Sequence, residues 1–572
     1  MRINRKRWVA VEADPLIERR LMRELGVGAI TAHILAGRNM GDPAQVQAFL
    51  RPRLADLMQP ETMCGAPAAA VRIADAVERG ESIAIHGDYD ADGVTATALL
   101  VEFLRAIGSN ATPYIPDRID QGYGFGPESA TDLAARGHKL LITVDCGAND
   151  HDAVRAAVAG GMDVIITDHH EIAGDPPPAV AVLNPHQAAC GFHGEPLAGV
   201  GIAFFLAGAV RGELVRRGHA GAAEFDLKSV LDLVALGTVA DIVPLTGQNR
   251  ILVAHGLPLL NESRRPGVAA LRQVAKVGVP VRCGDISYRL APRINAAGRL
   301  SHADVGVNLL LTRDPAEGET IARHLNEENA KRQAIEAQIF SEAKEMFEKI
   351  ARRERLSTIV LAHPDWHPGV IGIVASRMVE EFNRPTILLH VGEDSARGSG
   401  RSISAFNLFE ALQACGEFLE GFGGHAQAAG VKVRRDQIVP FAIAFDAHAR
   451  ATLTPEDMLP RQRVDAWCEI DDISDTLVRE LSMLAPFGFG NPEPVLATRD
   501  VPVLAKQVVG HDHLKLRVPW RKRALVVMAY SRAELLEHIG SRVDLAYSPE
   551  FNTFGGVEQI QLRVKDVVIP DL

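Results

Sequence analysis

Residues 83–93 read Ile83-Ala84-Ile85-His86-Gly87-Asp88-Tyr89-Asp90-Ala91-Asp92-Gly93. This stretch is a short apolar run followed directly by an imidazole and three carboxylates. The apolar run predicts a buried β-strand, and the sequence after it predicts a helix from about Val94. Like charges packed into the turn between them repel strongly unless cations bind there. The stretch therefore predicts a metal site at the end of a strand; the alternative interpretation is an Asp turn that only caps the helix.

Short apolar runs alternate with helical stretches from here to about Asn184. The expected strands are residues 83–85, 114–115, 140–144, 164–166 and 179–183. Such alternation is typical of a parallel sheet with crossover helices, which places this region in the α/β class. In open sheets of this kind, ligands bind outside the carboxyl ends of the strands.

Polar side chains also follow two later strands of the expected sheet. Asp145 comes after residues 140–144, and Asp168-His169-His170 follows residues 164–166. So many acids and imidazoles at one edge favour two ions that share a carboxylate over a single ion. Carboxylate and imidazole without thiolate suit manganese or magnesium, although zinc and iron are compatible with the same ligands. We expect Mn²⁺ to bind best.

The chain beyond the sheet predicts three further parts. A charged stretch from about Pro315 to Arg355 predicts one long helix. A second α/β region follows, with strands expected at residues 358–361 and 386–390 and a glycine-rich loop at 421–430. After prolines at 455–460 the period changes to two, as at residues 513–518 and 558–564, which predicts a small antiparallel β-barrel. Its turn Pro519-Trp-Arg-Lys-Arg523 suits base stacking and phosphate binding, or is a solvated hairpin tip.

Composition narrows the class of protein. A chain of 572 residues is too long for one compact core and is typical of three or more domains. Its six cysteines stand singly, which argues against a zinc cluster or a disulfide scaffold. The net charge of −11 does not exclude a DNA substrate, because bound cations neutralise metal-binding carboxylates.

No membrane segment or secretion signal is expected. The longest apolar run, residues 197–210, is broken by glycines and flanked by charges, which favours a buried helix. No continuous apolar stretch follows the basic residues near the start. We therefore expect a cytoplasmic protein.

These motifs resemble a known family. Asp168-His169-His170 is similar to the signature triplet of the DHH phosphoesterase superfamily, and residues 86–93 resemble its first motif in the RecJ branch. The resemblance continues in family order over about residues 60–570, although Cys146-Gly147 stands where an Asn-Gly pair is common. Further matching motifs lie at residues 115–124, 143–147, 240–244, 292–299, 366–372, 399–402, 423–430 and 486–494.

We expect five parts of the chain, of which the resemblance covers those after about residue 60. They are an N-terminal segment packed on the catalytic core (1–60), a parallel-sheet DHH catalytic domain (61–313), a long connecting helix (314–356), a smaller α/β DHH-associated substrate-binding domain (357–455) and an OB-like nucleic-acid-binding domain (461–572).

The resemblance also implies roles for individual residues. The expected metal ligands are Asp90, Asp92, Asp145, His169 and Asp241, with Asp145 bridging two divalent ions, Mn²⁺ or Mg²⁺. His86 and Asp88 are further candidate ligands, and His86 is alternatively a residue that orients a ligand. His170 is expected to face the scissile phosphate.

An exonuclease must also hold the strand end, which requires a cationic pocket for a 5′-phosphate and an aromatic platform beside it. Arg118 and Tyr123 fit these two roles; surface ion pairing and core packing are the alternatives. The resemblance adds Ser399 and Arg401 to the phosphate pocket and Arg293 as a contact to the strand. His425 either contacts the substrate backbone or forms a turn.

The implied function is a single-stranded-DNA-specific 5′-to-3′ exonuclease that releases 5′-mononucleotides by two-metal hydrolysis in recombination and repair. The implied partners are single-stranded DNA with a 5′ end, single-stranded-DNA-binding protein and, functionally, a DNA helicase. One alternative is an oligoribonuclease, nucleotide phosphatase or cyclic-dinucleotide phosphodiesterase of the same superfamily, which generally lacks the region after Pro460. The other is a non-catalytic DNA-binding replication scaffold. The presence of all five main metal-ligand residues argues against this alternative.

Overall fold

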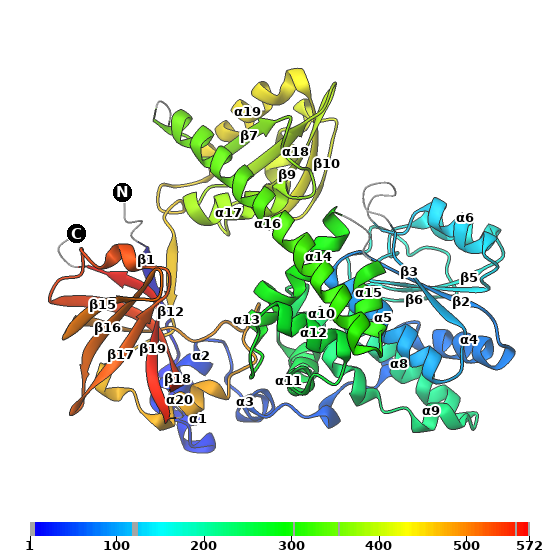
Figure 1. Ribbon diagram of the computed structural model, residues 1–572, viewed down its shortest axis with the longest axis horizontal. Helices are drawn as coiled ribbons and strands as arrows, with labels where there is room; N and C mark the ends of the chain where they lie inside the picture. The colour runs from blue at the N-terminus through cyan, green and yellow to red at the C-terminus, as the bar shows by residue number, and fades with distance from the viewer. Residues whose placement is uncertain (1–5, 117–123, 301–303, 353–354, 555–556, 570–572) are drawn as a thin grey trace. The chain divides into compact units, whose positions relative to one another are not determined.

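The computed structural model describes residues 6–116, 124–300, 304–352, 355–554 and 557–569. The chain forms two compact units (Figure 1). Unit 1 comprises Met1–Ala13, Ala330–Val478 and Pro494–Leu572, and unit 2 comprises Asp14–Asn329 and Arg479–Glu493. No helix among the described residues is both long and apolar enough to cross a membrane.

Unit 2 contains the predicted parallel sheet. Its strand order is β3-β2-β4-β5-β6, and every neighbouring pair is parallel. The strands are β2 (Ile83–Gly87), β3 (Ala111–Tyr114), β4 (Leu140–Val144), β5 (Asp163–Thr167) and β6 (Ala181–Leu183). The prediction of an α/β fold with a parallel sheet is therefore confirmed.

Helices cover both faces of this sheet. Alternate side chains of a strand point to opposite faces, so neighbouring residues of β2 belong to different buried clusters. Ile83 and Ile85 belong to one buried cluster with α4 (Ala66–Arg79), α5 (Ala91–Ala106) and α8 (Gly199–Arg216). Ala84 belongs to a second cluster with α6 (Pro127–Ala135) and α7 (His151–Ala159). The apolar run at 197–210 thus lies mostly within a buried helix, α8, as predicted.

Further helices complete unit 2 on the α5 and α8 side of the sheet. They include α10 (Leu231–Ala240), α11 (Gly247–Glu262), α12 (Pro266–Val274), α14 (Ala291–Leu300) and α15 (Asp304–Leu311). Near the N-terminus lie α1 (Pro15–Leu25), α2 (Ala29–Ala36) and α3 (Pro43–Leu50). Arg250 of α11 donates hydrogen bonds to the carbonyls of Phe49, Leu484 and Ala485, so one buried guanidinium ties α3 and the 479–493 segment to the helical core.

The predicted long helix is present as α16 (Pro315–Ala351), and the boundary between the units falls inside it. Unit 1 then forms a five-stranded sheet in the order β10-β11-β9-β8-β7. Its strands are β7 (Ile359–His363), β8 (Thr386–Val391), β9 (Ser395–Arg401), β10 (Gly421–Gly424) and β11 (Ala428–Arg434). The glycine-rich segment, expected as a loop, is mostly two antiparallel strands, because its small residues pair through their backbones.

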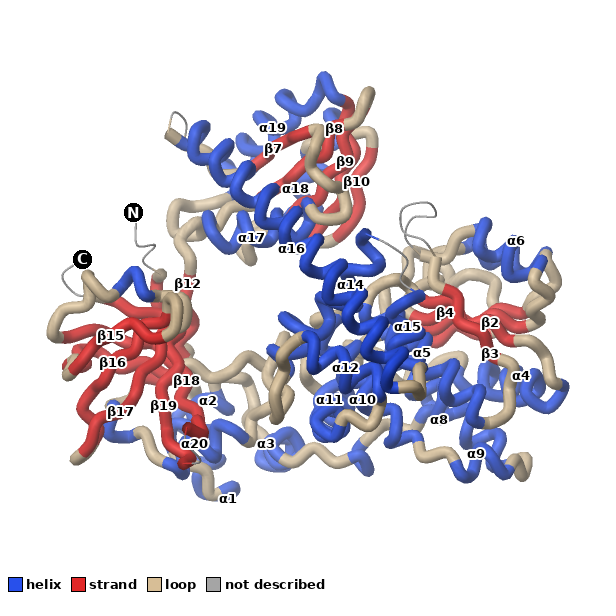
Figure 2. Tube along the Cα trace, in the orientation of Figure 1, coloured by secondary structure: helices blue, strands red, loops and turns tan. Residues whose placement is uncertain are grey.

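The C-terminal part of unit 1 is a seven-stranded sheet in the order β13-β14-β18-β19-β17-β16-β15. Its strands β15 to β19 are labelled in Figure 2. It contains β13 (Ala466–Trp467), β14 (Leu496–Pro502), β15 (Ala505–Val509), β16 (His513–Trp520), β17 (Arg523–Ala529), β18 (Arg542–Phe554) and β19 (Val557–Val568). Most neighbours are antiparallel, as expected, but β13 and β14 are parallel, and so are β17 and β19. Among the residues that the structure describes, this strand order does not show the predicted barrel to be closed. Separately, β1 (Arg7–Ala10) pairs with β12 (Arg461–Val464).

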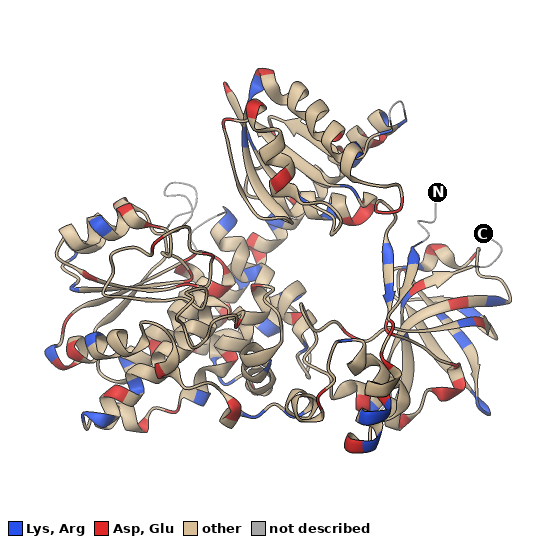
Figure 3. Ribbon diagram, turned by 180° about the vertical axis from the view of Figure 1, so that it is seen from behind, with Lys and Arg blue, Asp and Glu red and all other residues tan. Residues whose placement is uncertain are grey.

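Charged residues of both signs are interspersed along the chain (Figure 3). At the end of β16, beside the basic turn, the Trp520 indole donates its N–H to the Ile473 carbonyl over 3.0 Å. The Arg521 guanidinium lies 5.4 Å from the Trp520 ring centre. The tryptophan of this basic turn is therefore anchored to its own unit.

Candidate metal centre

The predicted metal ligands gather at the carboxyl edge of the parallel sheet in unit 2. Asp88 and Asp90 follow β2, Asp145 follows β4, and His169 lies two residues after β5. Asp241 comes from the C-cap of α10. Parallel strands end at one edge, and this geometry brings together side chains that are distant in sequence.

The turn after β2 is held by its own carboxylate. Asp90 is the N-cap of α5, and its Oδ1 accepts hydrogen bonds from the amides of Asp92 (2.9 Å) and Gly93 (3.2 Å). Asn295 Oδ1 accepts the Ala91 amide over 2.7 Å. The helix therefore starts at Ala91, three residues before the predicted position, because Asp90 satisfies its first free amides.

The N-terminus of α8 orients Asp92. The amide of Gly199 donates to Asp92 Oδ2 over 2.6 Å, and the amide of Val200 donates to Oδ1 over 2.9 Å. These donors form the positive end of a helix dipole, which favours a negative charge. Asp92 is almost fully buried, so its carboxylate has a fixed direction.

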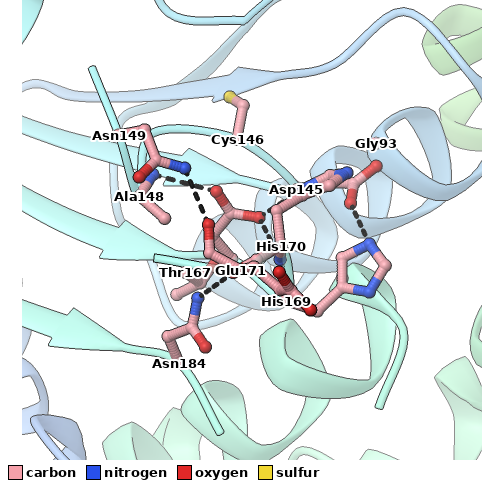
Figure 4. A network of polar contacts seen from close by, with 12 residues as sticks. Gly93, Asp145, Cys146, Ala148, Asn149, Thr167, His169, His170, Glu171 and Asn184 are labelled. Carbon is pink, nitrogen blue, oxygen red and sulfur yellow. Dashed lines mark hydrogen bonds and ion pairs between the residues drawn. The ribbon is translucent and has the colours of Figure 1, made fainter. Parts of the chain in front are cut away.

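Asp145 lies at the centre of the cluster. It adopts a left-handed backbone conformation (φ 61°), which few residues other than glycine adopt. His169 Nε2 lies 3.1 Å from Asp145 Oδ1 (Figure 4). The same nitrogen lies 3.5 Å from Asp241 Oδ2. One imidazole nitrogen thus faces two carboxylates from different elements.

Three overlapping sets of side chains have ligand atoms within 4.8 Å of one another: Asp92, His169 and Asp241; Asp88, Asp90 and Asp145; and Asp145, His169 and His170. Asp145 Oδ1, His169 Nε2 and Asp241 Oδ2 are buried and, apart from their close approach to one another, make no hydrogen bond to any described residue. Buried polar atoms without partners are uncommon, because desolvating them is costly. The donor set therefore fits divalent cations, and the overlap at Asp145 fits two of them.

Burial and mutual repulsion change the protonation of these acids when no cation is bound. Burial raises the pKa of Asp92 to about 8, and the charge of Asp241 adds to the shift. Burial, with a contribution from Asp90, raises the pKa of Asp241 to about 7. Burial and neighbouring carboxylates, chiefly Asp92, also raise the pKa of Asp145 well above its usual value. Divalent cations would relieve this repulsion.

His170 is held by Asp168. Asp168 Oδ1 lies 2.7 Å from His170 Nδ1, and Asp168 Oδ2 accepts the Ala148 amide over 2.9 Å. Burial opposes the charged ring, but the contact with Asp168 outweighs it and raises the pKa of His170 to about 9. Burial instead lowers the pKa of His169. The two adjacent histidines thus differ in character, one protonated and one suited to bind a cation.

His86 lies in none of the three sets of ligand atoms. It is completely buried, with its ring stacked on Tyr114 (5.4 Å between ring centres) and edge-on to Phe125. Its Nδ1 lies 3.6 Å from the Sγ of Cys146, and burial lowers its pKa to about 4. The His86 ring therefore packs against aromatic side chains, and its buried Nε2 makes no hydrogen bond to any described residue.

The predicted substrate residues are distributed over both units. In unit 2, Arg293 on α14 donates to Asn326 Oδ1 over 3.0 Å. In unit 1, Arg401 donates to Ser399 Oγ over 3.0 Å, so these two side chains are neighbours on β9. His425 lies in the turn between β10 and β11, where its amide donates to the Ala428 carbonyl. Arg118 and Tyr123 lie outside the described residues.

Several supporting residues were not predicted as site residues. Asn184 follows β6 and donates from Nδ2 to the His170 carbonyl over 2.8 Å (Figure 4). The rule that found Asp145, a polar residue at a strand end, applies equally to Asn184. Asn295 and the Gly199 amide carry no such signal, because they contact the β2 turn from 204 and 107 residues away, respectively.

Three family models match the chain. The DHH family N-terminal domain matches residues 82–238, the DHHA1 domain matches residues 355–447, and the RecJ OB domain matches residues 464–566. Their order is that of the parts implied by the sequence motifs.

Relatives match over most of the chain. It is 35% identical over 578 residues to the single-stranded-DNA-specific exonuclease RecJ of Bacillus subtilis, covering 100% of this chain and 72% of that protein. For the protein of the same name from Escherichia coli, the identity is 36% over 518 residues, covering 88% and 87%.

A solved structure matches the whole fold. The crystal structure of RecJ in complex with Mn²⁺ from Thermus thermophilus superposes with a TM-score of 0.83 at 31% identity, covering 100% of this chain and 80% of that one. The Mg²⁺ complex of the same protein has a TM-score of 0.77 at 30% identity, covering 99% and 78%.

Proposed function

The chain belongs to the RecJ family of single-stranded-DNA-specific exonucleases, and from this premise we propose that it removes 5′-mononucleotides from the 5′ end of single-stranded DNA. The convergence of Asp145, His169 and Asp241 supports this activity most directly, because three buried ligand atoms meet there without hydrogen-bond partners among the described residues. Phosphodiester hydrolysis is the reaction that paired divalent metals at such a site promote.

We assign five residues to two divalent ions, Mn²⁺ or Mg²⁺, with Asp145 as the shared ligand: Asp90, Asp92, Asp145, His169 and Asp241. When bound, the two ions activate a water and neutralise charge on the oxygen that leaves phosphorus. Asp88 is a further ligand in this assignment, because it groups with Asp90 and Asp145. His86 supports the turn from behind.

Groups of the protein itself orient the metal-binding carboxylates and keep His170 positively charged. The α8 amides fix the direction of the Asp92 carboxylate, and the left-handed conformation of Asp145 directs it toward His169. His170, protonated against Asp168, donates a charge-assisted hydrogen bond to the scissile phosphate. Asp168 is then a positioning residue, since it acts through His170.

The remaining roles concern the DNA strand. We propose that Arg118 binds the terminal 5′-phosphate, that Tyr123 stacks on a base, and that Ser399 and Arg401 also bind phosphate of the strand. The contact between Ser399 and Arg401 supports a joint role. Arg293 contacts the strand, and His425 contacts its backbone.

The proposed parts of the chain follow the family order: an N-terminal segment to about residue 60, a catalytic domain to 313, a connecting helix to 356, a substrate-binding domain to 455 and a DNA-binding domain from 461. The proposed setting is cytoplasmic recombination and repair. There, single-stranded-DNA-binding protein and a helicase would supply the substrate.

A nuclease assay tests this function. Single-stranded DNA, duplex DNA and RNA of one sequence are incubated with Mn²⁺, with Mg²⁺ and with chelator, using the wild type and Asp145→Ala. We expect metal-dependent release of mononucleotides from single-stranded DNA alone, and none with Asp145→Ala. Efficient RNA cleavage with inert DNA would assign the protein to the oligoribonuclease alternative, and the absence of all cleavage would favour a scaffold.

A further inference from the structure

A cavity of about 190 Å³ lies beside His169 in unit 2. His169 lines both this cavity and the metal centre, so a ligand in the cavity would be adjacent to the reacting phosphate. The cavity is smaller than the roughly 300–1,000 Å³ typical of sites for drug-sized ligands, which fits one ring system rather than a whole nucleotide. Its other walls are Pro185, His186, Gly194, Glu195, Pro196, Leu197 and Val243.

Two buried asparagines fix the walls of this cavity. Asn184 Oδ1 accepts the His186 amide over 2.8 Å, while its Nδ2 donates to His170. Asn249 donates from Nδ2 to the carbonyls of Pro196 (2.5 Å) and Pro244 (3.0 Å). Because the same two side chains tie together loops that line the cavity, its shape is preorganised rather than a chance gap.

The segment after α10 links the cavity to the metal centre. Asp241 faces His169, and Val243, two residues later, lines the cavity. Ile242 between them has a left-handed backbone (φ 64°), which is rare for a β-branched residue. Strained conformations of this kind tend to occur where structure is used for function.

We propose that this cavity receives one nucleobase flanking the scissile phosphate. This assignment rests on the proposed function. Its proline, leucine and valine walls suit the flat faces of a base, whereas Glu195 and His186 are available to its polar edge. Glu195 Oε2 is already oriented by the Gln248 amide over 3.3 Å. A base inside the cavity cannot pair with a complementary strand. Base binding in unit 2 would therefore by itself restrict cleavage to single-stranded DNA.

Abasic substrates test the cavity. Single-stranded 5′-phosphorylated oligonucleotides carry one abasic residue at the first, second or eighth nucleotide, and single-turnover cleavage is measured at the flanking bond. The wild type should cut at least about fivefold more slowly beside the first or the second abasic residue than an intact strand, the lower end of what stacking one base contributes. The residue at the eighth position should not affect the first cleavage.

The variant Val243→Phe fills the cavity and should bring this ratio close to one. Val215→Phe makes the same change on an exposed part of α8 and should keep the wild-type ratio. An unchanged ratio in Val243→Phe would refute the assignment. In the wild type, a polycyclic base analogue larger than the cavity should block cleavage at the same nucleotide, and unhindered cleavage would also refute it.

The two failures are distinguishable. A wild type that cuts no single-stranded DNA refutes the proposed function. A wild type that cuts intact and abasic strands equally refutes only the cavity assignment.

Discussion

Replacing Gly199 with Ala should disable the metal centre while leaving the fold in place. Gly199 is the first residue of α8, and a Cβ placed on it would lie 2.7 Å from the Cβ of Asp145. That atom is fixed to the backbone, so no side-chain rotation relieves the clash. Moving from 2.7 Å to the ordinary 3.4 Å contact requires a shift of about 0.7 Å of Asp145 or of the helix end.

A shift of this size matters because Asp145 is assigned to both metal ions. A misplacement of about 1 Å at a reacting centre typically costs on the order of 100-fold in rate, and we expect a loss of that order in kcat with Mn²⁺. The backbone of Gly199 is not left-handed, so the Ala variant should fold.

Gly212→Ala is the matched control on the same helix. Its Cβ would lie 3.4 Å from Glu61 Oε1, an ordinary contact, so nuclease activity should be unchanged. The free energy of unfolding should rise by up to about 1 kcal/mol, because Ala is favoured over Gly inside a helix. The assay is steady-state release of mononucleotides, with melting temperature measured in parallel. Full activity in a folded Gly199→Ala protein would refute the placement of Asp145 against α8.

The charges of the site lead to three further predictions. Asp92 and Asp241 hold protons more tightly when folded (pKa about 8 and about 7) than at their ordinary value of 3.8, so the free energy of unfolding of chelator-treated protein should fall as pH rises from about 4 to 8. Denaturant titrations at several pH values check this, and an equal fall with Mn²⁺ bound would contradict it. Asp168→Asn should lower kcat by about 10- to 100-fold with little change in KM, because His170 loses its ionic partner; an unchanged kcat would count against that role. Arg118→Ala should reduce the preference for 5′-phosphorylated over 5′-hydroxyl ends, and equal losses on both would exclude the phosphate pocket.

Much of the fold was predictable because local pattern and burial agree. Residues 140–144 form the predicted strand with its predicted bounds, since all but Thr143 are apolar and all five are buried. The start of α5 was placed three residues late, because the N-cap role of Asp90 is not distinguishable in sequence from its role as a ligand. The strand structure within 421–430 is not predicted, because glycine and alanine give no alternating pattern and the pairing of β11 with β9 is a long-range backbone contact.

The candidate site likewise has features that the sequence predicts and features that it does not. The acids and histidines at strand ends were predictable because a parallel sheet brings its carboxyl ends together. The sequence does not predict that His86 lies outside the sets of ligand atoms, because this depends on the packing of its ring against Tyr114 and Phe125. The sequence does not predict the cavity beside His169 either. The walls of this cavity come from loops that are distant in sequence and that Asn249 joins by hydrogen bonds.

Anomalous scattering from crystals grown with Mn²⁺ tests the central claim of a two-metal centre most directly. Data collected at the manganese edge should show two peaks about 3.5–4 Å apart, both within bonding distance of the Asp145 carboxylate. One peak should adjoin Asp92, His169 and Asp241, and the other should adjoin Asp88 and Asp90. A single peak, or two peaks that do not share Asp145, would contradict the assignment.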